Sequence, residues 1–157
     1  MNADLTLSHT SMRRLPIFRA LADRHAMWWR AALASLALLM FCAGISLFDE
    51  RTINGISVWS KPFKFSLSLT VYFATLTWFA PLMPNGYFQT RNGRLLTWIA
   101  IGCAIFEMVY FVLQASRGEA SHFNLTTPFY SVMYSLMGAG AVMLVTVCLW
   151  MGVVILR

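Results

Sequence analysis

The chain has 157 residues, of which 59% are hydrophobic and only 11% are charged, and its formal net charge is +6. Soluble domains carry about 25% charged residues, so the composition excludes a water-facing globular surface and predicts one that faces lipid. Each membrane span takes about 20 residues, so the length accommodates one domain of roughly four spans. The predicted fold class is therefore an all-α integral membrane protein, a four-transmembrane-helix bundle.

The basic residues indicate membrane topology and contact with lipid headgroups. Nucleic-acid binding would need a polar face to display them, and the chain has none of sufficient length. The cysteines Cys42, Cys103 and Cys148 each lie inside an apolar run and form no close pair. This spacing argues against a disulfide framework or a zinc site. The sequence indicates no metal site and no cofactor.

Residues 1–30 are predicted to form a cytoplasmic N-terminal segment. Within it, residues 13–30 are expected to fold as an amphipathic helix that begins near Pro16 and lies in the membrane interface. Trp28 and Trp29 would sit among the headgroups, with the basic face toward anionic lipid. The alternative is a basic lead-in to the first span, which is physically almost the same arrangement.

Two export signals compete with this interpretation. Arg13-Arg14 before an apolar stretch is similar to a twin-arginine signal, but Pro16 interrupts the pattern. A lipoprotein cleavage site before Cys42 is disfavoured by the bulky Phe41. The apolar run is also longer than a typical signal core, so cleavage is not expected.

Residues 31–157 are predicted to form the transmembrane domain, with spans at about 31–48, 62–83, 95–115 and 130–156. Asn54-Gly55 marks a turn after the first span. Ser60 followed by Pro62 is typical of a helix N-cap with proline in the first turn, and predicts where the second span begins.

The basic residues are distributed unequally between the two sides of the predicted bundle. The heavier side holds Arg13, Arg14, Arg19, Arg24, Arg30, Arg91, Arg94 and Arg157. The lighter side holds Arg51, Lys61, Lys64 and Arg117. The positive-inside rule assigns the heavier side to the cytoplasm. The sequence thus predicts a multi-pass protein of the plasma or inner membrane, with both termini cytoplasmic and the loops 49–61 and 116–129 outside.

Glu107 is the most informative single position in the sequence. A carboxylate at membrane depth costs at least about 2.5 kcal/mol and usually faces a bundle interior or a cavity. At 1.5 Å per residue, Glu107 lies about 12 Å below the outer end of the third span. Helical spacing joins it in one polar stripe with Cys103, Tyr110, Gln114 and Arg117.

Two interpretations of Glu107 stay open. The functional one is a proton or cation site, or an anchor for a ligand. The structural one is a protonated carboxyl that bonds to a neighbouring hydroxyl and holds helices together. Side chains lean toward the N-terminus of their own helix, which separates Lys64 from Glu107 and disfavours a direct ion pair. Tyr72 or Tyr134 is the expected hydrogen-bond partner.

The outer side of the bundle is predicted to carry a polar mouth that leads to Glu107. Lys61, Lys64 and Arg117 would make it cationic, and the loop that follows adds His122 and Asn124. For the lysines the alternative is snorkelling to the headgroups. His122 lacks nearby partners for a metal, a haem or a nucleophile, so a loop-ordering hydrogen bond is the favoured role.

Small residues on the fourth span predict close helix packing. Ser131, Ser135 and Ala139 recur every fourth residue, and Gly138 lies beside them. Such spacing lets helices approach closely, either within the chain or between protomers. Gly138 also lies near Glu107 in depth, so it would make room for a ligand or admit a neighbouring helix.

Three functions follow from these features. The first is a small transporter or channel subunit that handles an ion or small ligand through the outer polar site and Glu107. The second is an accessory or assembly subunit that packs through the fourth span against a partner membrane protein. The third, a membrane-embedded lipid-modifying enzyme using His122 and Glu107, has least support because paired carboxylates and a nucleophile motif are absent. No catalytic residue is assigned, and the small interior predicts a homo-oligomer if the protein conducts or transports.

Overall fold

The computed structural model describes residues 25–119 and 127–157. The long elements in these ranges are the helices α2 (Ala26–Ile45), α3 (Ser60–Phe79), α4 (Arg91–Arg117) and α5 (Pro128–Ile155). The short elements are the strands β1 (Thr52–Ile53) and β2 (Ile56–Ser57) and the 3-10 helices η1 (Ala80–Leu82) and η2 (Tyr87–Gln89). The strands pair as an antiparallel hairpin between α2 and α3, and η1 and η2 connect α3 to α4.

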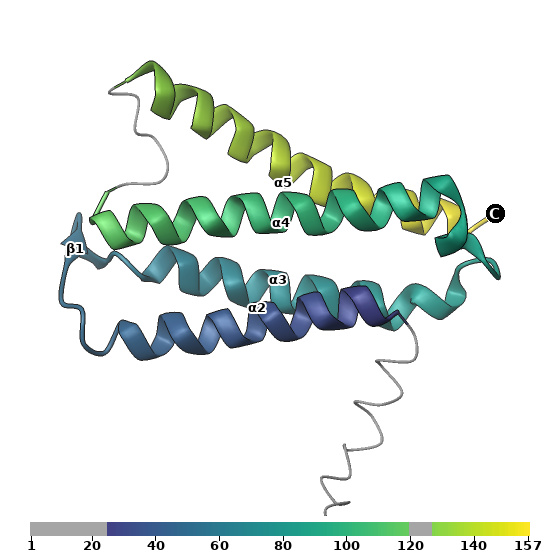
Figure 1. Ribbon diagram of the computed structural model, residues 1–157, viewed down its shortest axis with the longest axis horizontal. Helices are drawn as coiled ribbons and strands as arrows, with labels where there is room; N and C mark the ends of the chain where they lie inside the picture. The colour runs from purple at the N-terminus through teal and green to yellow at the C-terminus, as the bar shows by residue number, and fades with distance from the viewer. Residues whose placement is uncertain (1–24, 120–126) are drawn as a thin grey trace, which may run out of the picture.

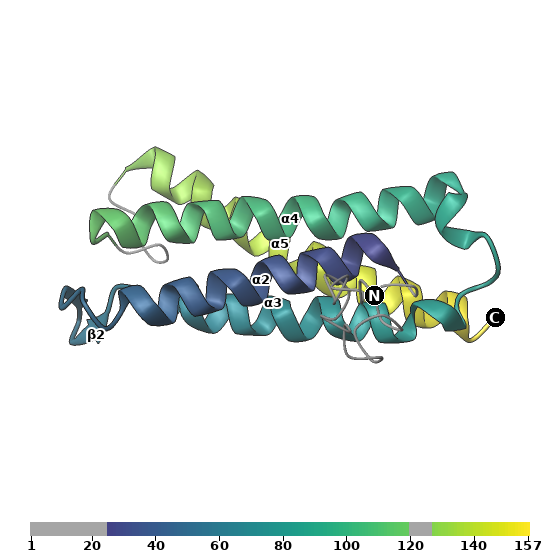
Figure 2. The same ribbon diagram turned by 60° about the horizontal axis from the view of Figure 1, so that its bottom comes forward.

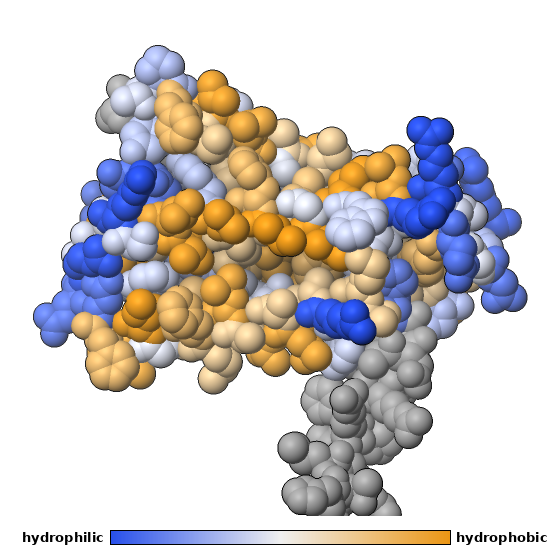
Figure 3. Space-filling view, in the orientation of Figure 1, coloured by the Kyte–Doolittle hydropathy of each residue, from blue (hydrophilic) through white to orange (hydrophobic). Residues whose placement is uncertain are grey.

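The prediction of four apolar helices is confirmed for the described part of the chain. All four are long and apolar enough to cross a membrane, by length and composition. Polar residues gather at the two ends of the molecule and an apolar belt lies between them, as a bilayer would require (Figure 3). Helix α2 begins at Ala26, so Trp28 and Trp29 belong to its first turns and not to a separate interfacial helix. Residues 13–24 of that predicted helix lie outside the described residues.

The four helices run up and down along one long axis. Helices α2 and α3 form an antiparallel pair, α4 lies over them, and α5 runs antiparallel to α4 (Figures 1 and 2). The β1–β2 hairpin, the end of α4 and the start of α5 lie at one end of the bundle, called here the hairpin end. The start of α2 and the end of α5 lie at the other, called the terminal end. This arrangement places the loop 49–59 and the described residues on either side of 120–126 at the same end, as the sequence predicts.

An aromatic cluster closes the terminal end. The side chain of His25 caps α2 by accepting a hydrogen bond from the backbone N–H of Trp28, at 3.3 Å. The ring of Phe88, from the α3–α4 connection, lies 4.4 Å from His25 and 5.1 Å from Trp28 between centroids. Trp28 is consequently 0% exposed, and burial lowers the pKa of His25. The cluster ties the start of α2 to the chain entering α4.

The first turn of α4 packs against the loop that precedes it. Thr90 caps the helix: its hydroxyl accepts from the Gly93 N–H at 3.1 Å and donates to the Tyr87 carbonyl at 2.6 Å. The backbone therefore folds back over Gly93. A β-carbon on Gly93 would lie 2.7 Å from the Cα of Phe88 and closer still to the Tyr87 carbonyl oxygen. Only glycine fits this position.

A polar network fixes the hairpin end. The Asp49 carboxylate accepts hydrogen bonds from Arg51, with Nη2 at 2.6 Å, and from the Trp59 indole N–H at 2.7 Å. Arg51 also donates from Nη1 to the Ser116 carbonyl in the last turn of α4, at 3.0 Å. Asn54 and Gly55 both have positive φ and form the predicted turn between the strands. The network thus joins the end of α2, the start of α3 and the end of α4.

Stability should depend on pH through this network. The hydrogen bonds from Arg51 and Trp59 hold the pKa of the Asp49 carboxyl well below its usual range. A lowered native pKa stabilises the fold above the unfolded-state pKa of about 4, and this contribution is lost as the pH falls through the native pKa. We expect Asp49→Asn to lower the thermal midpoint at pH 6 and the difference from wild type to shrink below about pH 4. Thermal unfolding across this range, with Glu50→Gln as the control, tests this; a pH-independent difference would contradict it.

Helix α5 is held to the bundle along its middle and its terminal half. The Tyr72 hydroxyl of α3 donates to the Leu144 carbonyl at 2.9 Å, and the Trp150 indole N–H donates to the Tyr87 hydroxyl at 2.8 Å. The buried residues of α5 are Met137, Gly140, Leu144, Val147 and Met151. None lies in its first nine positions, and this part diverges from α4 toward the hairpin end (Figure 1).

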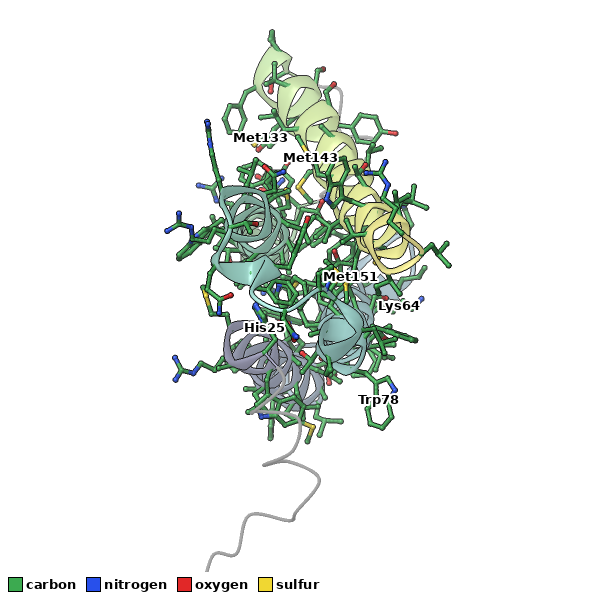
Figure 4. All side chains as sticks on the ribbon, turned by 90° about the vertical axis from the view of Figure 1, so that its right-hand side faces the viewer. His25, Lys64, Trp78, Met133, Met143 and Met151 are labelled. Atoms are coloured by element: carbon green, nitrogen blue, oxygen red, sulfur yellow. The ribbon has the colours of Figure 1, made fainter. Side chains whose placement is uncertain are left out.

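The view along the bundle axis shows the same arrangement. Helices α2, α3 and α4 lie close together, and α5 crosses them obliquely with Met133 and Met143 along its length (Figure 4). Lys64 and Trp78 lie on the outer side of α3, and Trp78 points away from the bundle. The oblique crossing means that α5 cannot contact α4 along its full length.

Candidate functional site

Glu107 lies in the interior of the bundle, on the side of α4 that faces α5. It is 1% exposed, and it belongs to the largest fully buried side chains of the described residues. Neither carboxylate oxygen has a hydrogen-bond partner within the part of the chain that the structure describes. Buried polar groups in folded proteins nearly always have a partner, so this carboxyl is an exception that needs a reason.

Gly140 of α5 is the residue that lies against the Glu107 carboxyl. A β-carbon on Gly140 would collide with Oε1 of Glu107 and lie 3.3 Å from its Cδ. A β-carbon on Gly138, by contrast, would meet nothing within 4 Å. Gly138, which the sequence predicts near Glu107, lines the same cavity as Glu107, whereas the close approach of the helices occurs at Gly140. The apolar spacing of Met137, Leu144 and Val147 on the same face is the signal that would have located it.

A cavity of about 270 Å³ lies beside Glu107, between α3, α4 and α5. Its lining residues are Phe65, Glu107, Phe111, Tyr134, Ser135, Met137, Gly138 and Ala141. Counting along α4 from its end at Arg117, Glu107 is about 15 Å deep at 1.5 Å per residue. Phe65 and Tyr134 lie nearer the starts of their helices, at the hairpin end. The cavity therefore extends inward from the region where α5 diverges to the level of Glu107, which contributes to its lining.

The predicted hydrogen bond from Tyr72 to Glu107 is wrong. The Tyr72 hydroxyl donates to the Leu144 carbonyl instead, because α5 crosses α3 at this level and brings its backbone within reach. Tyr134 lines the same cavity as Glu107, but the Glu107 oxygens accept no hydrogen bond from it. The interpretation of Glu107 as a hydroxyl-bonded link between helices therefore has no bond to support it among the described residues.

Lys61 and Lys64 lie together at the hairpin end. They line a second depression of about 410 Å³, called here the outer hollow, between the β1–β2 hairpin and the start of α3. Glu119 also lines it, and its carboxylate accepts a hydrogen bond from Tyr130 at 2.6 Å. Both lysines are exposed. The outer hollow thus carries both positive and negative side chains.

Phe111 lines both the outer hollow and the Glu107 cavity. On one side the Lys61 ammonium lies 5.8 Å from the centroid of its ring. On another, the Phe65 ring packs edge-on at 4.7 Å between centroids. Phe111 is therefore common to both hollows, and neither its ring nor that of Phe65 is among the site residues predicted from the sequence.

The other members of the predicted polar stripe take different positions. Tyr110 and Gln114 are buried on the inner side of α4, but neither is among the residues that line the Glu107 cavity. Arg117 is exposed at the end of α4. His122 and Asn124 lie outside the described residues. The lipid-modifying enzyme hypothesis depended on His122, so the structure adds nothing to it.

The predicted small-residue face of α5 does not make the contacts within the chain. Ser135, Gly138 and Ala139 are exposed and Ser131 is half-buried. The serine hydroxyls donate to carbonyls one turn earlier, from Ser135 to Ser131 and from Ser131 to Thr127. Within the bundle α5 packs through the face of Met137 and Gly140. Packing of the small-residue face against another chain stays a prediction.

The described residues contain no group of three or more His, Cys, Asp or Glu side chains that could hold a metal ion. Comparison of the chain with protein-family models, curated proteins and solved structures finds no match.

Proposed function

We propose that this is a multi-pass membrane protein that binds and handles a small ligand or ion at Glu107, as a small transporter or channel subunit does. The observation that carries the proposal is a buried carboxyl group that has no partner among the described residues and belongs to a residue that lines a cavity. Burying a polar group without a hydrogen bond costs about 1–3 kcal/mol. A residue that lowers stability in this way is best explained by a role in binding.

The orientation proposed from the sequence is compatible with this site. Arg30, Arg91, Arg94 and Arg157 lie at the terminal end, and the arginines of residues 1–24 precede it in the chain. We propose that the terminal end is cytoplasmic and that the Glu107 cavity extends toward the outer side. A single bundle of this size has little interior, which favours a homo-oligomer for transport.

Replacement of Glu107 by glutamine tests the proposal. Glu107→Gln keeps the shape of the side chain but removes its charge, so we expect occupancy of the bound ligand to fall at least about tenfold, a change of about 1.4 kcal/mol. Native mass spectrometry of protein released in mild detergent measures this occupancy and the oligomeric state together. Glu50→Gln is the matched control, because it removes one exposed carboxylate and should leave occupancy unchanged. Equal occupancy in wild type and Glu107→Gln, or no ligand in either, would argue against the proposal.

A second candidate is an accessory subunit that packs through α5 against a partner membrane protein. It is favoured by the exposure of Ser135, Gly138 and Ala139 on α5. A stoichiometric complex with a different protein in the same mass spectrum, lost when Ala139 is replaced by leucine, would support this role in place of the first.

A further inference from the structure

The charges around the Glu107 cavity restrict what it can hold. Eight described residues line it, and Glu107 is the only one of them whose side chain type is usually charged at neutral pH. The two lysines of the chain, Lys61 and Lys64, line the outer hollow and are not among the residues that line this cavity. An anion would meet no base among these residues, and a neutral ligand would have no charge to pair with an ionised Glu107. A positive ligand complements the site.

The walls of the cavity favour an organic cation over a metal ion. Ca²⁺ takes six to eight oxygen ligands and Mg²⁺ demands an octahedral set. Besides the Glu107 carboxylate, the side-chain oxygens in the lining are the hydroxyls of Tyr134 and Ser135. Most of the remaining lining is aromatic or apolar, which suits a ligand whose charge is carried by an apolar body.

Aromatic rings supply the second attraction that such a ligand needs. Phe65, Phe111 and Tyr134 line the cavity together. Aromatic rings attract alkylammonium groups within about 6 Å of the ring centroid, and clusters of them recognise quaternary ammonium ions. The Phe111 ring already lies 5.8 Å from a cation of this protein, the Lys61 ammonium.

We propose that the ligand is an organic monocation with a small apolar body, such as a quaternary ammonium ion, held between the Glu107 carboxylate and the aromatic rings of the cavity. This inference rests on the proposed binding at Glu107 and names its ligand class. The cavity of about 270 Å³ equals roughly nine times the share of liquid volume of one water, which suits a body on the order of ten heavy atoms. Gly140 lies against the carboxyl, so the ligand reaches the carboxyl when the Glu107 side chain turns into the cavity.

Equilibrium dialysis against nanodiscs, with protein-free nanodiscs as the blank, tests the ligand class. The probes are benzyltrimethylammonium, its uncharged carbon isostere neopentylbenzene, and benzenesulfonate. We expect wild type to bind the cation at least about tenfold more tightly than either other probe, after subtraction of the blank. Glu107→Gln should abolish this preference.

Two aromatic variants separate the role of the rings from that of the fold. Phe65→Leu keeps an apolar side chain at the cavity but removes the ring, and should weaken binding of benzyltrimethylammonium by about 2–10-fold without changing that of neopentylbenzene. Phe79→Leu removes an exposed ring on the same helix and should not change the binding of either probe. A Phe65→Leu variant that binds the cation as wild type does would overturn the role of the rings.

The outcomes also separate this inference from the proposed function. Equal binding of the cation and its isostere, or preference for the sulfonate, overturns the cation class. If none of the three probes binds but wild type carries another ligand that Glu107→Gln loses, the cation class again fails and the binding role of Glu107 stands. If no probe binds and no ligand is carried, both fail.

Discussion

Gly140→Ala is expected to lower the free energy of unfolding by about 1–3 kcal/mol, the usual range for overpacking a core. The added methyl group would collide with the Glu107 carboxyl, which is enclosed at 1% exposure. Either the carboxyl moves into the cavity or α5 moves away from α4. Both changes disturb the proposed site, so ligand occupancy should fall together with stability.

A double-mutant cycle isolates this contact. In the Glu107→Ala background the obstacle is gone, and Gly140→Ala should become neutral or stabilising through the higher helix propensity of alanine. Gly138→Ala is the matched control on the same helix, since a β-carbon there meets nothing within 4 Å. Thermal unfolding in detergent measures all the variants. A Gly140→Ala cost that is the same in both backgrounds would show that the contact with Glu107 is not its cause.

Gly93→Ala is expected to be more damaging for the fold, with a loss of about 2–3 kcal/mol or more. Here the new methyl group would meet backbone, at 2.7 Å from the Phe88 Cα and 2.8 Å from the Tyr87 carbonyl carbon. Backbone cannot rotate aside as a side-chain end does. The loop would have to move outward, which would withdraw the Phe88 ring from His25 and Trp28.

The measurement is again thermal unfolding, supplemented by the fluorescence of the tryptophans. Gly102→Ala, in the same helix, is the control because nothing lies within 4 Å of a β-carbon there; alanine should raise stability by up to about 1 kcal/mol. We expect Gly93→Ala to expose Trp28 and to lower the thermal midpoint well below that of Gly102→Ala. Similar midpoints for the two variants would refute the close approach of the loop at Gly93.

Local sequence patterns were sufficient to predict the helices, because each long apolar run specifies its own element. The expected spans and the observed helices agree in number and approximate bounds. The Asn54-Gly55 turn was likewise predicted from its local chemistry. The start of α2 was misplaced, since Pro16 and the tryptophans suggested a separate helix. Trp28 instead lies in the first turn of α2 and packs against Phe88, a residue distant in the sequence.

The importance of Glu107 could also be inferred from the sequence, because a carboxyl within an apolar helix is costly wherever that helix packs. The residues that surround its carboxyl could not be inferred from the sequence. The predicted bond from Tyr72 required knowledge of where α5 crosses α3, and the Leu144 carbonyl accepts that bond instead. The same crossing places Gly140, and not Gly138, in contact with the carboxyl.

The sequence by itself determined that the chain forms apolar helices with a carboxyl inside one of them, since these properties depend on composition and on neighbours along the chain. The tertiary structure alone decided that α5 diverges at the hairpin end, that Phe65 and Phe111 stand beside Glu107, and that the carboxyl has no partner among the described residues. These features depend on the angle and register at which helices cross, which are set by packing between residues far apart in the sequence.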